Sequence, residues 1–120
     1  RVIYPTLHTG EIGARAKKYF KGGNGGLVGI EVKGGVEAGK KFIEALKMFY
    51  HVANIGDARS LAIHPATTTH SQLTEKELLA AGVTPGYVRL SIGIEHPDDI
   101  IADLKQALDA AGSVKLKAVS

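Results

Sequence analysis

The sequence predicts an α/β (α+β) domain with a mixed or antiparallel sheet of about four strands and helices covering one face. Strand-like and helix-like segments alternate along the chain. Residues 27–33 and 87–95 place apolar side chains at every second position, as a half-buried strand does. Strands of a fully parallel sheet are covered on both faces and read as continuous apolar runs. These half-polar strands therefore favour a mixed or antiparallel sheet.

Length and composition indicate one folded domain over residues 1–120. The chain has 44% hydrophobic and 22% charged residues, which is ordinary for a domain with a core of its own. No apolar run approaches the roughly 18 residues of a membrane-spanning helix, so we expect no membrane partner. The chain contains no cysteine, which excludes disulfides and thiolate metal sites and fits a reducing compartment.

The net charge of +3 does not indicate a nucleic-acid surface. The lysines are spread along the predicted helices, and aromatic residues do not interleave with them as a base-stacking platform requires. The five histidines lack the spacing of a metal site: His64 and His70 are six residues apart across a proline. We therefore expect neither a nucleic-acid partner nor a metal ligand in this chain.

The first half of the chain predicts two strands and two helices. Residues 2–7 form a short strand, and residues 12–20 form a helix that the glycine-rich segment 21–26 ends. This segment runs from helix into strand, so it is a connection and not a phosphate-binding loop. The alternating strand 27–33 follows. Residues 38–53 are predicted as a helix, whose apolar stripe consists of Phe42, Leu46, Phe49 and Ala53.

The second half begins with a short strand at 60–64 and a helix whose start is marked by local chemistry. Thr74 and Glu77 have the spacing of a capping box, and Gly82 ends this helix. The strand 87–95 comes next, and its core-facing residues are expected to be Val88, Leu90, Ile92 and Ile94. The last helix begins near Pro97. Its predicted buried stripe consists of Ile100, Ile101, Leu104, Ala107, Leu108 and Ala111.

Arg89 is the sharpest candidate for a binding residue. It lies inside a strand, between apolar neighbours, on the face away from the expected core. Its planar guanidinium can donate two parallel hydrogen bonds to one carboxylate. The alternative is a structural ion pair with Glu31 or Glu95 across the sheet. The residues expected on this open polar face are Glu31, Ser60, His64, Arg89 and Ser91.

Two segments resemble the C-terminal signature of the pyridoxal-phosphate (PLP) enzymes of cysteine and methionine metabolism. They are Gly-Asp-Ala-Arg-Ser-Leu-Ala-Ile-His-Pro-Ala-Thr-Thr-Thr-His at 56–70 and Tyr-Val-Arg-Leu-Ser-Ile-Gly-Ile-Glu at 87–95. The resemblance implies the small C-terminal domain of a fold-type I PLP enzyme. It also implies that Arg89 binds the substrate α-carboxylate and that Ser60 contributes to the same site. The alternation of the strands predicts that Ser60 shares the face of Arg89.

Thr69 and Arg59 carry the finer parts of this resemblance. Thr69 resembles a residue that orients the carboxylate-binding arginine, although a helix-cap or loop hydroxyl fits the residue equally well. Relatives that process cystathionine tend to have glutamate where this chain has Arg59. Arg59 and the segment His-Ser-Gln-Leu at 70–73 resemble the O-acetylhomoserine sulfhydrylase branch. That branch replaces acetate with sulfide to form homocysteine. The alternatives are a cystathionine γ-synthase or γ-lyase, or a stand-alone amino-acid-binding module without chemistry.

The cofactor site is expected outside these residues. The family anchors PLP on a lysine in a Ser-x-x-Lys context, and no lysine here has that context. We therefore expect no catalytic or cofactor-binding residue in this chain, and PLP held by the remainder of the enzyme chain. Met48 is the only methionine, so we expect a piece of a longer protein that is inactive by itself. The resemblance further implies a cytoplasmic homo-oligomer, typically a tetramer.

Overall fold

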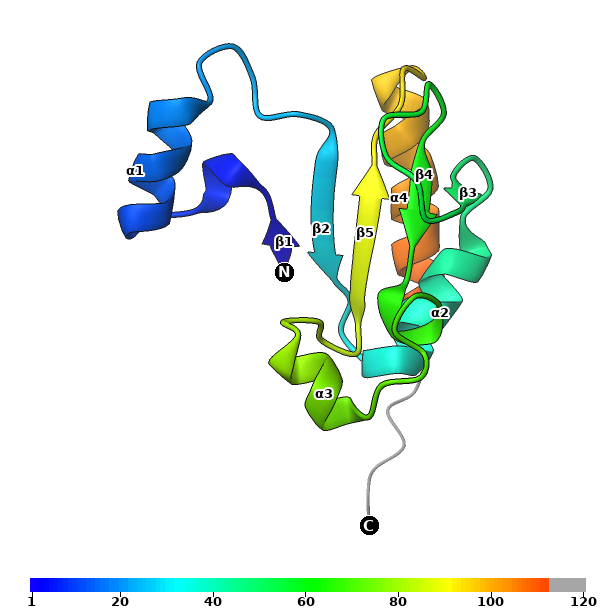
Figure 1. The fold of residues 1–120 in the computed structure, drawn as a ribbon. Helices are drawn as coiled ribbons and strands as arrows, with labels where there is room; N and C mark the ends of the chain where they lie inside the picture. The colour runs from blue at the N-terminus through cyan, green and yellow to red at the C-terminus, as the bar shows by residue number, and fades with distance from the viewer. Residues whose placement is uncertain (113–120) are drawn as a thin grey trace.

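The computed structural model describes residues 1–112 and contains a five-stranded sheet with the order β1-β2-β5-β4-β3 (Figure 1). Strand β5 pairs antiparallel with both β2 and β4, β1 pairs antiparallel with β2, and β3 pairs parallel with β4. The strands are β1 (Val2–Ile3), β2 (Leu27–Glu31), β3 (Tyr50–His51), β4 (Leu61–Ile63) and β5 (Tyr87–Ser91). The sheet is therefore mixed, as the half-polar strands predicted, with one strand more than the expected four.

Two of the helices cover one face of this sheet. Helices α2 and α4 lie side by side behind the strands, while α1 stands apart as an arm and α3 lies beyond one end of the sheet (Figure 1). The helices are α1 (Gly10–Tyr19), α2 (Gly35–Ala45), α3 (Glu75–Ala80) and α4 (Pro97–Gly112), with short 3-10 helices η1 (Pro5–Leu7) and η2 (Pro65–Thr67). The core between sheet and helices includes Val32, Ala38, Phe42, Ile43, Phe49, Ala62, Val88, Leu90, Ile100, Ala107 and Ala111. None of these helices is long and apolar enough to cross a membrane.

A helix forms where residues 38–53 predicted one, but the predicted end was wrong. The helix ends at Ala45, and Leu46 already has extended backbone. Asp103 on α4 causes this end: its carboxylate accepts hydrogen bonds from the backbone N–H groups of Lys47 and Met48 at 2.9–3.2 Å. Gln106 donates to the carbonyl of Ala45 at 2.6 Å. The chain after α2 therefore turns back toward the sheet to form β3.

The predicted strand 87–95 and the predicted buried stripe of the last helix both included too many residues. The expected strand 87–95 ends at Ser91, and Ile94 is 86% exposed because the chain has already left the sheet. The buried stripe of α4 is narrower than predicted, since Ile101 and Leu108 are exposed. Asp103, which no apolar pattern indicated, is buried on that stripe instead.

The local start and stop signals of α3 are confirmed. The Thr74 hydroxyl accepts from the N–H of Glu77 at 3.4 Å, and the Glu77 carboxylate accepts from the N–H of Thr74 at 2.7 Å. This is the predicted capping box. Gly82 follows the helix with φ +76°, a left-handed conformation that glycine adopts without strain.

His64 is fully buried, which corrects its expected place on an open polar face. It follows β4 in the phase of Ala62, a core residue, and its ring packs against Gly39 of α2. Its Nε2 lies 2.7 Å from the carbonyl oxygen of Pro85, and its Nδ1 lies 3.0 Å from the Thr67 hydroxyl. A buried polar ring with both nitrogens bonded joins α2, β4 and the entry to β5.

Asp103→Asn tests how much the cap on the end of α2 contributes. Burial raises the pKa of Asp103, but the N–H groups of Met48, Lys47 and Phe49 and the amide of Gln106 outweigh it and lower the pKa. A lowered folded-state pKa stabilises the fold at neutral pH, and this stabilisation is lost as pH falls through that pKa. We expect the substitution to lower the free energy of unfolding by about 2 kcal/mol at neutral pH and by less in acid.

Urea unfolding at neutral and acidic pH measures this difference. Asp109→Asn is the matched control, because Asp109 is exposed on the same helix. An equal effect of the two substitutions at neutral pH would contradict the role given to Asp103.

Candidate carboxylate-binding site

Arg89 lies in the middle of the sheet on the face that α2 and α4 leave uncovered. Its cross-strand partners are Gly29 on β2 and Ile63 on β4, while the adjacent Val88 and Leu90 point into the core. The Nη2 of Arg89 donates to the carbonyl of Asn54 at 3.1 Å. The Nε is buried and has no hydrogen-bond partner among the described residues. A buried N–H without a partner is costly, so Nε is a candidate donor for a group that the described residues do not supply.

Arg89 does not form the alternative ion pair with Glu31 or Glu95 among the described residues. Glu31 lies opposite Tyr87 in the register, and the carboxylate of Glu95 binds Ser60. No ion pair within residues 1–112 involves Arg89. Its charge is therefore not balanced by a neighbouring carboxylate in this part of the chain.

A shallow hollow of about 280 Å³ lies beside Arg89. It exists because Gly29, directly opposite Arg89, has no side chain; a Cβ there would lie 2.8 Å from the Tyr87 ring. The hollow is large enough for a small amino acid and has one cationic side chain in its wall. The lining residues are Ile3, Tyr4, Pro5, His8, Leu27, Val28, Gly29, Tyr87 and Arg89.

A loop of residues 54–58 closes the other side of the Arg89 guanidinium. Two short turns shape it: the Asn54 side chain accepts from the N–H of Ile55, and the Asp57 side chain accepts from the N–H of Arg59, each at 2.9 Å. Gly56 supplies the left-handed backbone with φ +76°. The loop is fixed at its far end by the carbonyl of Ala58, which accepts from the N–H of Ile94 at 2.9 Å.

Ser60 is fully buried, and its polar groups are already used. Its N–H and hydroxyl both donate to the Glu95 carboxylate, at 2.6 and 2.7 Å, and its oxygen accepts from the N–H of Gly93 at 2.9 Å. We call these three hydrogen bonds the Ser60–Glu95 lock. They join the entry of β4 to the exit of β5 and lower the pKa of Glu95, chiefly through the Ser60 N–H.

The prediction that Ser60 lies on the same face of the sheet as Arg89 was wrong. Ile63 is the partner of Arg89, and Leu61 is the partner of Ser91, so Leu61 and Ile63 share the face of Arg89. Ser60 is one residue out of phase with Leu61 and lies just before the strand. Ser60 therefore does not share the face of Arg89.

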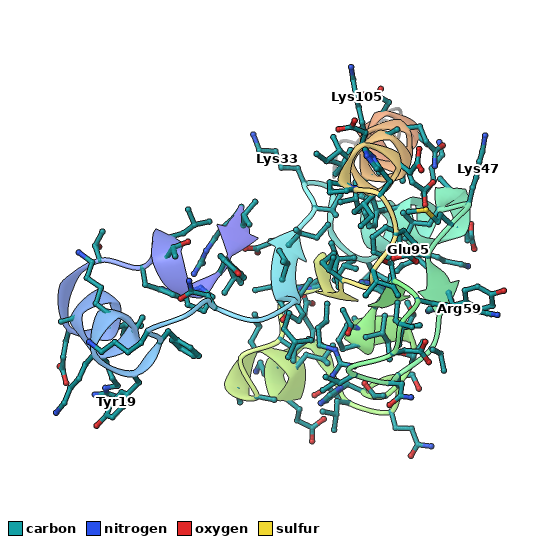
Figure 2. The ribbon with its side chains drawn as sticks, turned by 90° about the horizontal axis from the view of Figure 1, so that it is seen from above. Tyr19, Lys33, Lys47, Arg59, Glu95 and Lys105 are labelled. Carbon is teal, nitrogen blue, oxygen red and sulfur yellow. The ribbon has the colours of Figure 1, made fainter. Side chains whose placement is uncertain are left out.

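Thr69 and Arg59 lie outside direct contact with Arg89. Thr69 is in the turn after η2, and its hydroxyl lies 2.8 Å from Nδ1 of His70. Arg59 places its guanidinium 4.7 Å from the centre of the Tyr50 ring, and its side chain extends outward from the sheet (Figure 2). Arg59 therefore stacks on a surface ring, an arrangement that stabilises exposed arginines.

Three of the lysines lie at the surface, unlike the lysine that anchors PLP. Lys33, Lys47 and Lys105 are exposed and extend away from the body of the protein (Figure 2). An amine that forms a covalent link needs an enclosed site that lowers its pKa. These three exposed lysines are therefore poor candidates for the link to the cofactor aldehyde.

Sequence reasoning missed Asn54 and the lock made by Glu95. Asn-Ile-Gly-Asp at 54–57 is a strong turn signal that marks the loop, but not which residue its carbonyl would contact. Glu95 was considered only as a possible partner for Arg89. Its real partner lies 35 residues away.

Gly93→Ala tests the Ser60–Glu95 lock. A Cβ at position 93 would meet the Ala58 carbonyl oxygen and lie 2.6 Å from Oε2 of Glu95, so the lock cannot keep its geometry. Because Ser60 lowers the pKa of Glu95, we expect the substitution to return this pKa toward its ordinary value. Carboxyl-carbon NMR titration measures the pKa. Gly22→Ala is the control, since a Cβ there meets nothing within 4 Å, and an unaltered Glu95 pKa in Gly93→Ala would refute the lock.

Comparisons with known proteins show the family of this chain. The sequence profile of the family described as Cys/Met metabolism PLP-dependent enzyme matches residues 1–109. An O-acetyl-L-homoserine sulfhydrylase of Leptospira meyeri is 60% identical over 108 residues, covering 89% of this chain and 24% of the relative. O-acetyl-L-homoserine sulfhydrylase 1 of Thermus thermophilus is 54% identical over 107 residues, covering 89% of this chain and 25% of the relative.

The fold also matches a solved structure. A crystal structure of a putative O-acetylhomoserine (thiol)-lyase from Campylobacter jejuni has a TM-score of 0.80 and 48% identity, and carries N'-pyridoxyl-lysine-5'-monophosphate. The match covers 90% of this chain and 26% of that chain. This chain thus spans about a quarter of the length of the relatives it matches. Because the family profile matches nearly the whole sequence, the chain belongs to the PLP-dependent enzymes of Cys/Met metabolism.

Proposed function

We propose that this chain is the C-terminal, carboxylate-binding domain of a PLP-dependent O-acetylhomoserine sulfhydrylase. The full enzyme replaces the acetate of O-acetylhomoserine with sulfide and releases homocysteine. The observation that carries the proposal is the buried, unpartnered Nε of Arg89 beside a hollow. Relatives named for this activity are 54–60% identical over most of the chain, which supports the sulfhydrylase branch over the cystathionine enzymes.

Arg89 binds the α-carboxylate of the substrate in this proposal. Its guanidinium is held on one side by the Asn54 carbonyl, so the fork presents Nε in a fixed direction. Holding the carboxylate fixes the position of Cα relative to the cofactor, which removes much of the entropic cost of the reaction. When bound, PLP supplies the electron sink for the carbanion chemistry. The chain described here supplies orientation.

Ser60 and Thr69 have supporting roles in the same proposal. A direct hydrogen bond from Ser60 to the substrate requires Glu95 to release the hydroxyl, because the lock uses it fully. Thr69 lies in the turn after η2, six residues beyond Ile63, the cross-strand partner of Arg89, so its effect on the arginine is indirect. Arg89 makes the principal contact in this proposal.

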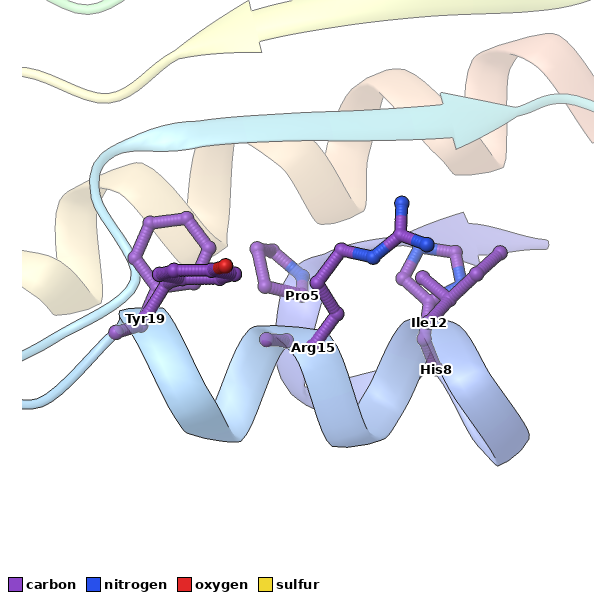
Figure 3. Close-up of a pocket in the computed structure, with 7 residues that line it drawn as sticks. Pro5, His8, Ile12, Arg15 and Tyr19 are labelled. Atoms are coloured by element: carbon purple, nitrogen blue, oxygen red, sulfur yellow. The ribbon is translucent and has the colours of Figure 1, made fainter.

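The arm formed by η1 and α1 is the proposed contact with the remainder of the enzyme chain. An apolar groove of about 400 Å³ lies along it, between Pro5, His8, Ile12, Arg15, Ala16, Tyr19 and Phe20 (Figure 3). Ile12 and Tyr19 are 58% and 69% exposed, and exposed apolar patches of this kind mark interfaces. Relatives about four times as long have enough additional chain to cover it. We further propose that the full enzyme is a cytoplasmic homotetramer.

Assays of the full-length enzyme test the activity. Purified enzyme with O-acetylhomoserine and sulfide is expected to form homocysteine and acetate. Cystathionine formation from cysteine and an acylated homoserine, with no reaction toward sulfide, would contradict the sulfhydrylase proposal and favour the cystathionine branch.

Arg89→Lys in the full-length enzyme tests the carboxylate contact. A lysine keeps the charge but replaces a planar fork with a single point, so at least one hydrogen bond to the carboxylate is lost. We expect KM for O-acetylhomoserine to rise by about 10- to 100-fold, as measured by steady-state kinetics. Arg1→Lys, an exposed conservative exchange, is the control. An unaltered KM in Arg89→Lys would rule out this role.

A further inference from the structure

We propose that Ser91 is a positioning residue for Arg89 and acts by holding the loop of residues 54–58. This role depends on the proposed function, since Arg89 must itself bind the carboxylate for its orientation to matter. The Ser91 hydroxyl accepts a hydrogen bond from the N–H of Gly56 at 3.3 Å.

The Ser91 hydroxyl is buried in an apolar part of the sheet. Ser91 lies on the same face as Arg89, two residues farther along β5, and is 4% exposed. Its cross-strand partners are Leu27 on β2 and Leu61 on β4. The row of side chains that crosses the sheet here is therefore leucine, serine, leucine. A buried hydroxyl between two leucines is unfavourable unless it makes a hydrogen bond, and the Gly56 N–H provides it.

The loop needs such a tether. Residues 51–59 are all exposed, so little side-chain burial holds the loop against the sheet. The Ala58 carbonyl is bonded to Ile94 at one end of the loop, and the Asn54 carbonyl meets Arg89 at the other. Gly56 lies midway between them and bonds to Ser91. Without this bond, the half of the loop that carries the Asn54 carbonyl is held by Arg89 and, from the preceding segment, by the pairing of β3 with β4.

The Asn54 carbonyl sets the direction of the guanidinium. It accepts from Nη2 of Arg89 at 3.1 Å, which leaves Nε as the unpartnered donor. Binding of a carboxylate by a planar fork depends on the orientation of the fork, so a turned guanidinium loses a hydrogen bond to the substrate. Loss of the Ser91 hydroxyl therefore frees the Asn54 carbonyl and allows the Arg89 fork to turn away from the productive direction.

A double-mutant cycle in the full-length enzyme tests this coupling. Ser91→Ala is combined with Arg89→Lys, and kcat and KM for O-acetylhomoserine are measured for each variant. We expect Ser91→Ala to raise KM about tenfold with kcat within about twofold of wild type, as the loss of one ordered hydrogen bond predicts. Ser91→Thr keeps the hydroxyl and recovers most of the affinity. In the Arg89→Lys background, Ser91→Ala has no further effect on KM, because residues that act through one another are not additive.

Controls separate this role from a general loss of structure. Ser71→Ala removes a hydroxyl from an exposed turn, and the melting temperature of every variant is recorded. An unaltered KM in Ser91→Ala, or an effect that adds fully to that of Arg89→Lys, overturns the role of Ser91 while leaving the carboxylate site intact. An unaltered KM in Arg89→Lys overturns the proposed function itself. The two failures are therefore distinguishable.

Discussion

The antiparallel register of β5 with both of its neighbours is the constraint on which the rest of the structure depends. It places Val88 and Leu90 in the core and, by alternation, turns Arg89 to the opposite face. The same register sets Gly29 beside Arg89, which leaves the hollow open, and sets two leucines beside Ser91. A slip of one residue would bury the guanidinium among the core side chains and expose the leucine and valine. Core packing and the site are therefore fixed by one set of backbone hydrogen bonds.

The segments next to β4 and β5 are held in place around Arg89 by hydrogen bonds. The loop of residues 54–58 has almost no buried surface, so its place is determined by hydrogen bonds to β5 and to the segment that follows it. The Ser60–Glu95 lock joins the same two segments and satisfies the buried serine completely. Buried polar groups that are fully paired give a single arrangement rather than several. Among the buried side-chain atoms of residues 1–112, the Nε of Arg89 is left without a hydrogen-bond partner, which is why we propose it as a donor to a ligand.

Sequence reasoning succeeded where the determining interactions are local and failed where they are not. The capping box at Thr74 and the alternation around Arg89 depend on residues within a few positions, and both were predicted. The end of α2 is determined by Asp103, more than 50 residues away, so the apolar stripe through Phe49 was extended into a helix that does not form. The buried state of Ser60 and His64 also depends on partners distant in sequence. The placement of Arg89 on the open face was thus predictable, whereas the residues that contact it and shape its surroundings were not.

The most direct test of the central claim is a crystal structure of the full-length enzyme with a bound, unreactive α-amino acid such as glycine. We expect a carboxylate oxygen at about 3 Å from Nε or a terminal nitrogen of Arg89, with Nη2 still bonded to the Asn54 carbonyl. A carboxylate held by other groups, with the Nε of Arg89 still unpartnered, would contradict the account.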